Sequence, residues 1–232
     1  QLLVQNSKLA AMGEMIGMIA HQWRQPLSSI STLAGNLKVY LDLDMYEKNQ
    51  FLSLLEEINH HAQYLSSTIN DFRHFFKPDN PQDTVYLNVV IDNTLGIIGK
   101  SLEYKNVQLN INTSFSQPIL TYPNELMQVF LNILKNASDA FVDNETSYPR
   151  IQINGYEKNN YQIVEIIDNA GGIPERILNK IFDPYFSTKG PGIGTGLGLY
   201  MSKTIVEEHC MGELIARNTQ EGACFTLKFP LR

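Results

Sequence analysis

The sequence predicts a chain of fold class α + α/β: an antiparallel helical hairpin that forms a dimeric four-helix bundle, followed by an α+β sandwich with a mixed sheet. Up to Phe76, apolar residues recur at alternating steps of three and four, the heptad rhythm of a helix with a narrow seam. After a Pro/Asn/Asp-rich stretch, helical and strand-like segments alternate. We expect the hairpin over residues 1–77, a linker over 78–82 and a second domain over 83–232.

The heptad rhythm of the first part is interrupted once, at the polar stretch from Asp42 to Lys48, and resumes at Phe51. This pattern indicates two long antiparallel helices with a short connection. One such hairpin has little against which to bury its seam, so we expect a homodimer through a four-helix bundle. The alternative is a lone coiled-coil spacer packed on its own second domain.

The second part reads as three helices and several strands, mostly in hairpins. Pro123 suits the first turn of a helix, and residues 158–160 read as the turn of a hairpin. We expect helices over 88–103, 123–142 and 196–209, and strands over 107–113, 119–122, 151–156, 162–167, 213–217 and 224–229.

Composition narrows the class of protein. The chain has 232 residues, is 43% hydrophobic and carries a net charge of -6, which excludes disorder as the dominant state and argues against a nucleic-acid partner. Cys210 and Cys224 are too few for a disulfide framework, and no apolar run approaches the roughly 18 residues of a membrane span. We expect a cytoplasmic location. Because Gln1 lies inside an apolar period, we also expect that an upstream sensory region is missing from this fragment.

Three segments of the second part carry residues suited to nucleotide chemistry. The glycine-dense stretch 189–199 runs into a helix, which makes a plausible phosphate cradle, with a flexible surface loop as the alternative. Asp168 ends a strand and could accept a hydrogen bond from an exocyclic amine, while Gly172 leaves room for a flat ring. Asn132 and Asn136 share a helix face and suit Mg²⁺, although buried or capping asparagines would look the same.

Together these segments resemble, in order, the ATP-binding domain of sensor histidine kinases, a member of the Bergerat or GHKL fold group. The N box is similar to residues 124–140, the first glycine box to 168–173, the phenylalanine box to 181–189 and the second glycine box to 194–199.

The resemblance implies the roles of the individual residues. It implies that ATP is bound with Mg²⁺ at Asn136, supported by Asn132, that Asp168 reads adenine and that Gly172 lines the adenine pocket. The remaining residues that it implies for nucleotide binding are Lys189, Gly194, Gly196, Leu197 and Gly198. Residues 183–195 would form a mobile ATP lid, and we expect that lid to be loosely ordered without nucleotide.

Residues 20–27 are similar to the phosphoacceptor box of the same family. The heptads place His21 on the outer face of its helix, and a neutral imidazole is a suitable nucleophile. Gln22 stands where the family commonly has an acidic residue, and Gln25, one turn beyond His21, could place a water for removing phosphate from a partner. Pro26 should bend the helix near His21. The other four histidines match no box, and we expect them at the surface or an interface.

The resemblance implies an ATP-dependent protein histidine kinase of a two-component system, which phosphorylates His21 and passes the phosphoryl group to an aspartate of a response-regulator receiver domain. One alternative is an ATPase of the same fold, but such enzymes use a glutamate one turn before the magnesium-binding asparagine, where this chain has Asn132. The other is a sensor acting mainly as a phosphatase or a non-catalytic dimeric scaffold, which Gln22 keeps open.

Overall fold

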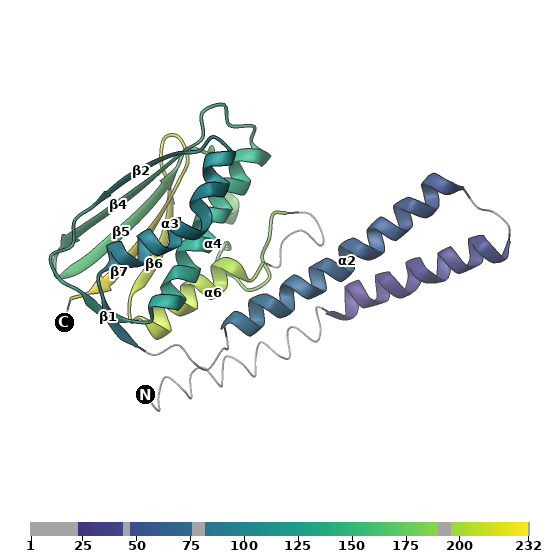
Figure 1. Cartoon of the computed structure of the whole chain (residues 1–232), viewed down its shortest axis with the longest axis horizontal. Helices are drawn as coiled ribbons and strands as arrows, with labels where there is room; N and C mark the ends of the chain where they lie inside the picture. The colour runs from purple at the N-terminus through teal and green to yellow at the C-terminus, as the bar shows by residue number, and fades with distance from the viewer. Residues whose placement is uncertain (1–22, 44–46, 76–81, 190–195, 232) are drawn as a thin grey trace. The chain divides into compact units, whose positions relative to one another are not determined.

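A computed structural model describes residues 23–43, 47–75, 82–189 and 196–231, with side chains from 67 to 75 left out (Figure 1). The chain divides into two compact units, one of residues 1–77 and 187–196, the other of residues 78–186 and 197–232. Each is described by itself. No described helix has the length and apolar character that crossing a membrane requires.

The first unit contains the expected pair of helices. One covers residues 23–42, and α2 covers Lys48–Phe75. The side chain of Gln50 donates to the hydroxyl of Tyr40 over 3.3 Å, which joins the two helices beside their connection. The first helix continues through Pro26, whereas His21, near which we expected a bend, lies outside the described residues.

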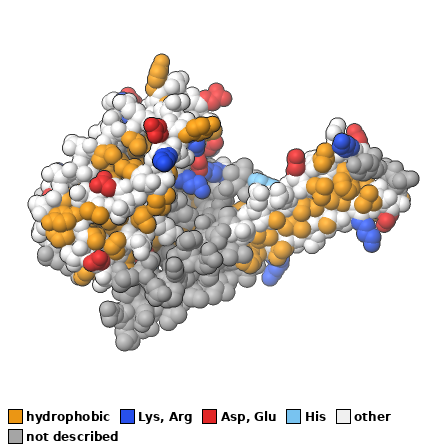
Figure 2. Space-filling view, in the orientation of Figure 1, with side chains coloured by type: hydrophobic (Ala, Val, Ile, Leu, Met, Phe, Trp, Pro, Cys, Tyr) orange, Lys and Arg blue, Asp and Glu red, His pale blue; other side chains and the backbone are white. Residues whose placement is uncertain are grey.

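The hairpin buries only part of its apolar surface within one chain. Leu37 is 8% exposed, as a seam residue should be. Other large apolar side chains of the hairpin are 44–61% exposed: Leu27, Val39, Leu41, Leu43, Leu52 and Leu55. Figure 2 shows that hydrophobic side chains occur along the surface of the hairpin. Leu55 belongs to the stripe that the heptads predict, so this stripe is available for burial against another surface.

The second unit is built on a five-stranded mixed sheet with the order β2-β4-β5-β7-β6. The edge strand β2 (Gln108–Thr113) runs parallel to β4 (Arg150–Lys158), and the other neighbours are antiparallel. The remaining strands of this sheet are β5 (Tyr161–Asp168), β6 (Glu213–Asn218) and β7 (Ala223–Pro230). The β4–β5 turn uses Asn159 and Asn160 at φ 52° and 65°, the left-handed region that a two-residue hairpin turn requires.

Helices cover one face of this sheet, as the sequence predicts (Figure 1). They are α3 (Leu87–Tyr104), α4 (Pro123–Asp143) and α6 (Gly198–Thr204). Alternate strand residues face them, and the paired Ile153 and Ile166 are both 2% exposed. Leu126 and Ile133 of α4 are fully buried. Each such side chain contributes about 1.5–3 kcal/mol, so the core holds α4 firmly against the sheet.

Several elements differ from the prediction. A short strand β1 (Asp83–Val85), which is too brief to show alternation, pairs with β3 (Ile119–Thr121), and a single turn α5 (Glu175–Leu178) follows the Asp168 loop. The helix expected to reach His209 as an α-helix changes at Ile205 into a π-helix, η1 (Ile205–His209). Buried positions there recur every four residues, at Met201, Ile205 and His209, a spacing that the wider π-turn accommodates.

Candidate nucleotide-binding site

Asp168 ends β5 on the helix-covered face of the sheet, opposite Ile151 of β4, and is 7% exposed. Its Oδ1 accepts hydrogen bonds from the backbone N–H groups of Ala170, at 2.9 Å, and Ala223, at 3.1 Å. Burial raises the pKa of this carboxyl, and the two backbone bonds offset part of that rise. Because both bonds go to Oδ1, Oδ2 can accept a hydrogen bond from a ligand.

The turn after Asp168 is held open by glycine and clamped by a residue that the sequence did not single out. Gly171 and Gly172 have φ values of +84° and +83°, which only glycine adopts without strain. Asn218, at the end of β6, accepts from the N–H of Ile173 at 2.8 Å and donates to its carbonyl at 2.7 Å. A Cβ on Gly172 would lie 2.9 Å from Oδ1 of Asn218, so this close approach leaves no room for a side chain.

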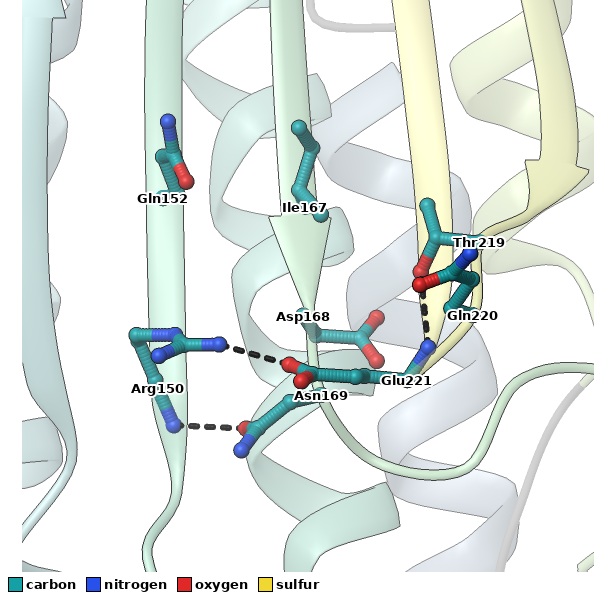
Figure 3. Close-up of a pocket in the computed structure, with 8 residues that line it drawn as sticks. All are labelled: Arg150, Gln152, Ile167, Asp168, Asn169, Thr219, Gln220 and Glu221. Carbon is teal, nitrogen blue, oxygen red and sulfur yellow. Dashed lines mark hydrogen bonds and ion pairs between the residues drawn. The ribbon is translucent and has the colours of Figure 1, made fainter.

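A hollow of about 330 Å³ lies on the sheet face opposite the helices, and Asp168 is among the residues that border it (Figure 3). Gln152 and Ile167 are paired across β4 and β5 on that face, and Arg150 forms an ion pair with Glu221 at 2.6 Å. The buried Asp168 carboxyl instead shares the helix-covered face with Ile166. We therefore place the nucleotide site on the helix side and assign no ligand to this hollow.

Asn132 and Asn136 are half-buried and lie one turn apart on α4. Asn132 donates from Nδ2 to the Ser202 hydroxyl over 3.0 Å, and that hydroxyl donates to the Gly198 carbonyl over 2.9 Å. A Cβ on Gly198 would overlap Oδ1 of Asn132, so the two helices approach as closely as glycine permits. The sequence analysis did not single out Ser202. Its position one turn after Gly198 on the expected helix was a signal that could have indicated it.

The far end of α4 meets the Asp168 loop. Asn144, which caps α4, donates from Nδ2 to the Ala170 carbonyl over 2.6 Å. Along the helix, Asn132 and Asn144 are separated by about 18 Å at 1.5 Å per residue. One helix thus connects the Gly198 contact to the Asp168 loop, and Asn136 lies between them.

The remaining expected residues are distributed as follows. Leu197 is fully buried, and Gly196 has a φ of +65°, in the left-handed region. Lys189 donates its backbone N–H to the Ser187 hydroxyl at 3.1 Å. Lys189 and Gly196 belong to the first unit, so their place beside Asp168 stays a prediction. Gln25 is exposed on the first helix, whereas His21, Gln22, Gly194 and most of the expected lid's glycines lie outside the described residues.

Fold and site together define a nucleotide-binding domain of the ATPase type joined to a helical hairpin. Residues 121–232 match the family described as "Histidine kinase-, DNA gyrase B-, and HSP90-like ATPase". Residues 11–81 match the "His Kinase A (phospho-acceptor) domain". The chain thus carries, in order, both domains of a histidine kinase catalytic core.

Curated relatives agree with this assignment. The chain is 27% identical to "Two-component sensor PprA" of Pseudomonas aeruginosa over 100% of its length and 26% of that protein. It is 30% identical to "Sensor histidine kinase ZraS" of Escherichia coli over 97% of its length and 46% of that protein. The chain thus spans about half or less of the curated relatives it matches.

Solved structures support the fold. The histidine kinase ThkA, in its complex with the response regulator protein TrrA, matches 98% of this chain and 64% of that chain with a TM-score of 0.68 at 21% identity. The Acinetobacter baumannii histidine kinase AdeS matches 91% of this chain and 98% of that chain with a TM-score of 0.62 at 20% identity. Both combine a helical region with the α/β domain found here.

Proposed function

We propose that this chain is the catalytic core of a two-component sensor, which uses ATP to phosphorylate His21 and then passes the phosphoryl group to an aspartate of a response-regulator receiver domain. One observation carries the proposal: a buried carboxylate, Asp168, keeps one oxygen available beside a glycine turn, in a chain that also matches a phospho-acceptor domain. Residues 1–77 would supply dimerisation and the acceptor, 78–82 the linker and 83–232 ATP binding.

Adenine would be recognised by Asp168, whose Oδ2 accepts a hydrogen bond from the exocyclic amine. Gly172 would line the adenine pocket with its backbone alone, because the position of its missing Cβ is filled by the Asn218 side chain. The phosphates would lie where Gly198, at the start of α6, packs against Asn132 of α4, beside the backbone of Leu197. Lys189, Gly194 and Gly196 would join them when the lid approaches.

A Mg²⁺ ion fits this arrangement, because amide oxygens with water and phosphate are the ligands it prefers. Asn136 would hold it, and no described group forms a hydrogen bond with the Asn136 side chain. Asn132 supports the same region from one turn away. When bound, Mg²⁺ neutralises phosphate charge during transfer.

At the acceptor, the neutral imidazole of His21 would attack the γ-phosphorus, forming a nitrogen–phosphorus bond as ADP leaves with the bridging oxygen. Gln22 can accept the Nδ1–H of His21 and so present Nε2 to the phosphate. Gln25 would act in the opposite direction, by positioning a water that removes phosphate from the partner protein.

The hairpin would also provide the dimer interface. The apolar stripe that the heptads predict, which includes the exposed Leu55, is of the kind that a second copy of the hairpin covers in a four-helix bundle. Covering this stripe removes apolar surface from water, and a symmetric pair of hairpins does so with the same residues on both chains.

Incubation with γ-labelled ATP and Mg²⁺ tests the proposal. Wild-type protein should acquire a label that is stable in base and lost in acid, as phosphohistidine is, and should transfer it to a receiver domain. His21→Ala should bind ATP normally yet acquire no label, whereas Asp168→Asn should fail to bind. A histidine label on His21→Ala would overturn the acceptor assignment. Steady ATP hydrolysis without any labelled protein would favour the ATPase alternative, and dephosphorylation of a receiver without labelling would favour the phosphatase.

A further inference from the structure

A buried acid–base pair joins the start of α4 to the end of η1. Nδ1 of His209 lies 2.5 Å from Oε2 of Glu125, and each side chain is 3% exposed. The pair is unexpected from the sequence, which placed His209 at the surface or an interface. An ionised Glu125 accepts the Nδ1–H of His209, whereas a neutral carboxyl donates to Nδ1, so the two side chains share one hydrogen bond in either state.

The surroundings hold this pair in one geometry. The ring of Tyr122 meets that of His209 edge to face, with centroids 6.1 Å apart. The π-helix directs His209 inward, and the N–H of Gly212 bonds to the Val206 carbonyl at 2.8 Å immediately after it. Burying two ionisable groups is costly, and packed hydrophobic residues would stabilise the fold as well or better. The pair therefore calls for a role besides stability.

Its position relative to the Asn132–Ser202 hydrogen bond indicates that role. Asn132 follows Glu125 by seven residues on α4, and Ser202 precedes His209 by seven residues. The two helices thus run antiparallel and are linked by two polar contacts about two turns apart. Two polar contacts at different positions along the helix axis fix the lengthwise position of one helix relative to the other, whereas apolar packing tolerates small shifts.

We propose that Glu125 and His209 are positioning residues for the triphosphate: their bond sets the lengthwise register of α6 on α4, and so keeps Gly198 against Asn132 where the phosphates bind. This inference rests on the proposed function. Loss of the pair should affect the phosphates and not adenine, because Asp168 lies on β5 and is held by backbone amides of Ala170 and Ala223, not by α6. Adenine recognition should therefore be independent of the pair.

The variant that tests this is the double substitution Glu125→Leu with His209→Leu. It replaces the pair by apolar side chains of similar size and leaves no uncompensated charge, so the domain should stay folded. Glu125→Gln keeps an acceptor oxygen toward Nδ1 and should act as the rescuing conservative variant. Lys105→Met is the matched control, since it removes another polar contact to α4, the 2.9 Å bond from Lys105 to Ser138, which does not involve α6.

Calorimetry with ATP in Mg²⁺ and with adenosine gives the main readout. We expect the double variant to bind ATP about tenfold more weakly, or 1.4 kcal/mol, with adenosine affinity unchanged. Glu125→Gln and Lys105→Met should keep the wild-type ratio of the two affinities. An unchanged ratio in a folded double variant would overturn the inference, as would an equal loss for both ligands.

Amide exchange in the nucleotide-free protein gives a second readout. Residues 198–204 should exchange faster in the double variant than in Lys105→Met, because the helix that α6 and η1 form together has lost the Glu125–His209 contact with α4. Equal exchange rates would contradict the proposal that the Glu125–His209 bond sets the register of α6 on α4. If wild-type protein bound neither ATP nor adenosine, the proposed function would fail instead, and the exchange comparison would still decide whether the pair sets the register.

Discussion

Gly222 packs against Asp168 so closely that a methyl group on it would overlap the Asp168 carbonyl oxygen and lie 2.6 Å from Oδ1. Ala223, the first residue of β7, donates its N–H to Oδ1 of Asp168. The loop before it accepts the N–H of Gly171 at the Glu221 carbonyl over 2.9 Å. The backbone of this loop therefore forms one wall around the buried carboxylate, and it can pack this closely only because residue 222 is glycine.

Gly222→Ala should accordingly destabilise the domain and weaken nucleotide binding together. Overpacking of this kind costs about 1–3 kcal/mol, and it acts on the group that would read adenine. Thermal unfolding and ATP calorimetry measure the two effects. Gly96→Ala is the matched control, because a Cβ there meets nothing within 4 Å in the middle of α3, and it should raise stability by up to about 1 kcal/mol. A Gly222→Ala protein as stable as wild type would contradict this account of the wall.

Asp168→Asn should separate stability from binding. Burial raises the pKa of Asp168 in the folded protein above its ordinary value of 3.8, so the ionised carboxyl disfavours folding at neutral pH. This penalty is present above the folded-state pKa and disappears as the pH falls through it. The neutral variant should therefore unfold at an equal or higher temperature than wild type at pH 7, with the difference shrinking toward pH 4.

The same variant, Asp168→Asn, should lose affinity for ATP. Its Nδ2 would face the exocyclic amine donor to donor, and a hydrogen bond to a charged acceptor contributes about 1.5–3 kcal/mol, or roughly 10- to 100-fold in affinity. Calorimetry at pH 7 checks the affinity and scanning calorimetry between pH 4 and 7 checks the stability. A variant that is less stable at pH 7 yet binds ATP normally would refute both statements.

Asn136→Ala should weaken ATP binding only when Mg²⁺ is present. The amide oxygen would serve the metal, so its loss should cost about tenfold, or 1.4 kcal/mol, in Mg²⁺ and little in the presence of a chelator. Asn132→Ala is the informative comparison, because Asn132 also bonds Ser202 and contacts Gly198. It should weaken ATP under both conditions. Equal behaviour of the two variants would show that Asn136 has no separate metal role.

Much of the fold was predictable from the sequence, because its large elements repeat a simple period. The heptads that give the helical hairpin, and the alternation that gives β4 and β5, each extend over enough residues to be recognised. β1 and α5 were missed because three or four residues carry no period. The π-turn was missed because it depends on which side chains α4 presents to residues 205–209, a tertiary property.

The candidate site likewise contains residues that the local sequence indicates and residues that depend on tertiary packing. Asp168, Gly172 and Asn132 could be proposed as site residues because they belong to local segments with a resemblance to known boxes. Asn218 and Gly222 were not, since each contacts a residue far away in the chain: Asn218 bonds Ile173, 45 residues earlier, and Gly222 packs against Asp168. His209 was expected at the surface or an interface because its partner, Glu125, is 84 residues away. Only the packing of η1 on α4 brings them together.

Gln25→Ala should slow removal of phosphate from the partner and leave labelling of His21 unchanged. Gln25 is exposed on the first helix, so its substitution should not disturb packing. A glutamine that only positions a water contributes to hydrolysis and not to attack by the imidazole. Timing the loss of receiver phosphate for wild type and Gln25→Ala measures the effect, with a substitution of Gln63, an exposed glutamine on α2, to alanine as the control. An unchanged rate would remove the water-positioning role.

Gln22→Glu should speed the labelling of His21. In the common family arrangement an acidic residue follows the histidine, and its carboxylate can orient the imidazole and stabilise the positive charge that grows on it during attack. Gln22 keeps the acceptor for Nδ1–H but carries no charge and cannot take up a proton. Orientation should therefore survive in the wild type while electrostatic assistance is missing. Restoring about 1.4 kcal/mol of transition-state stabilisation would raise the rate about tenfold.

The measurement for Gln22→Glu is the initial rate of base-stable label at saturating ATP, so that differences in nucleotide affinity do not enter. Because the assistance depends on an ionised carboxylate, the gain should be present at pH 7 and 8 and should fall as the carboxyl becomes protonated, near its ordinary pKa of about 4.3. Gln25→Glu carries the same added charge one turn away and controls for a general effect of negative charge. A Gln22→Glu rate equal to or below that of wild type would show that the amide is the better partner for His21.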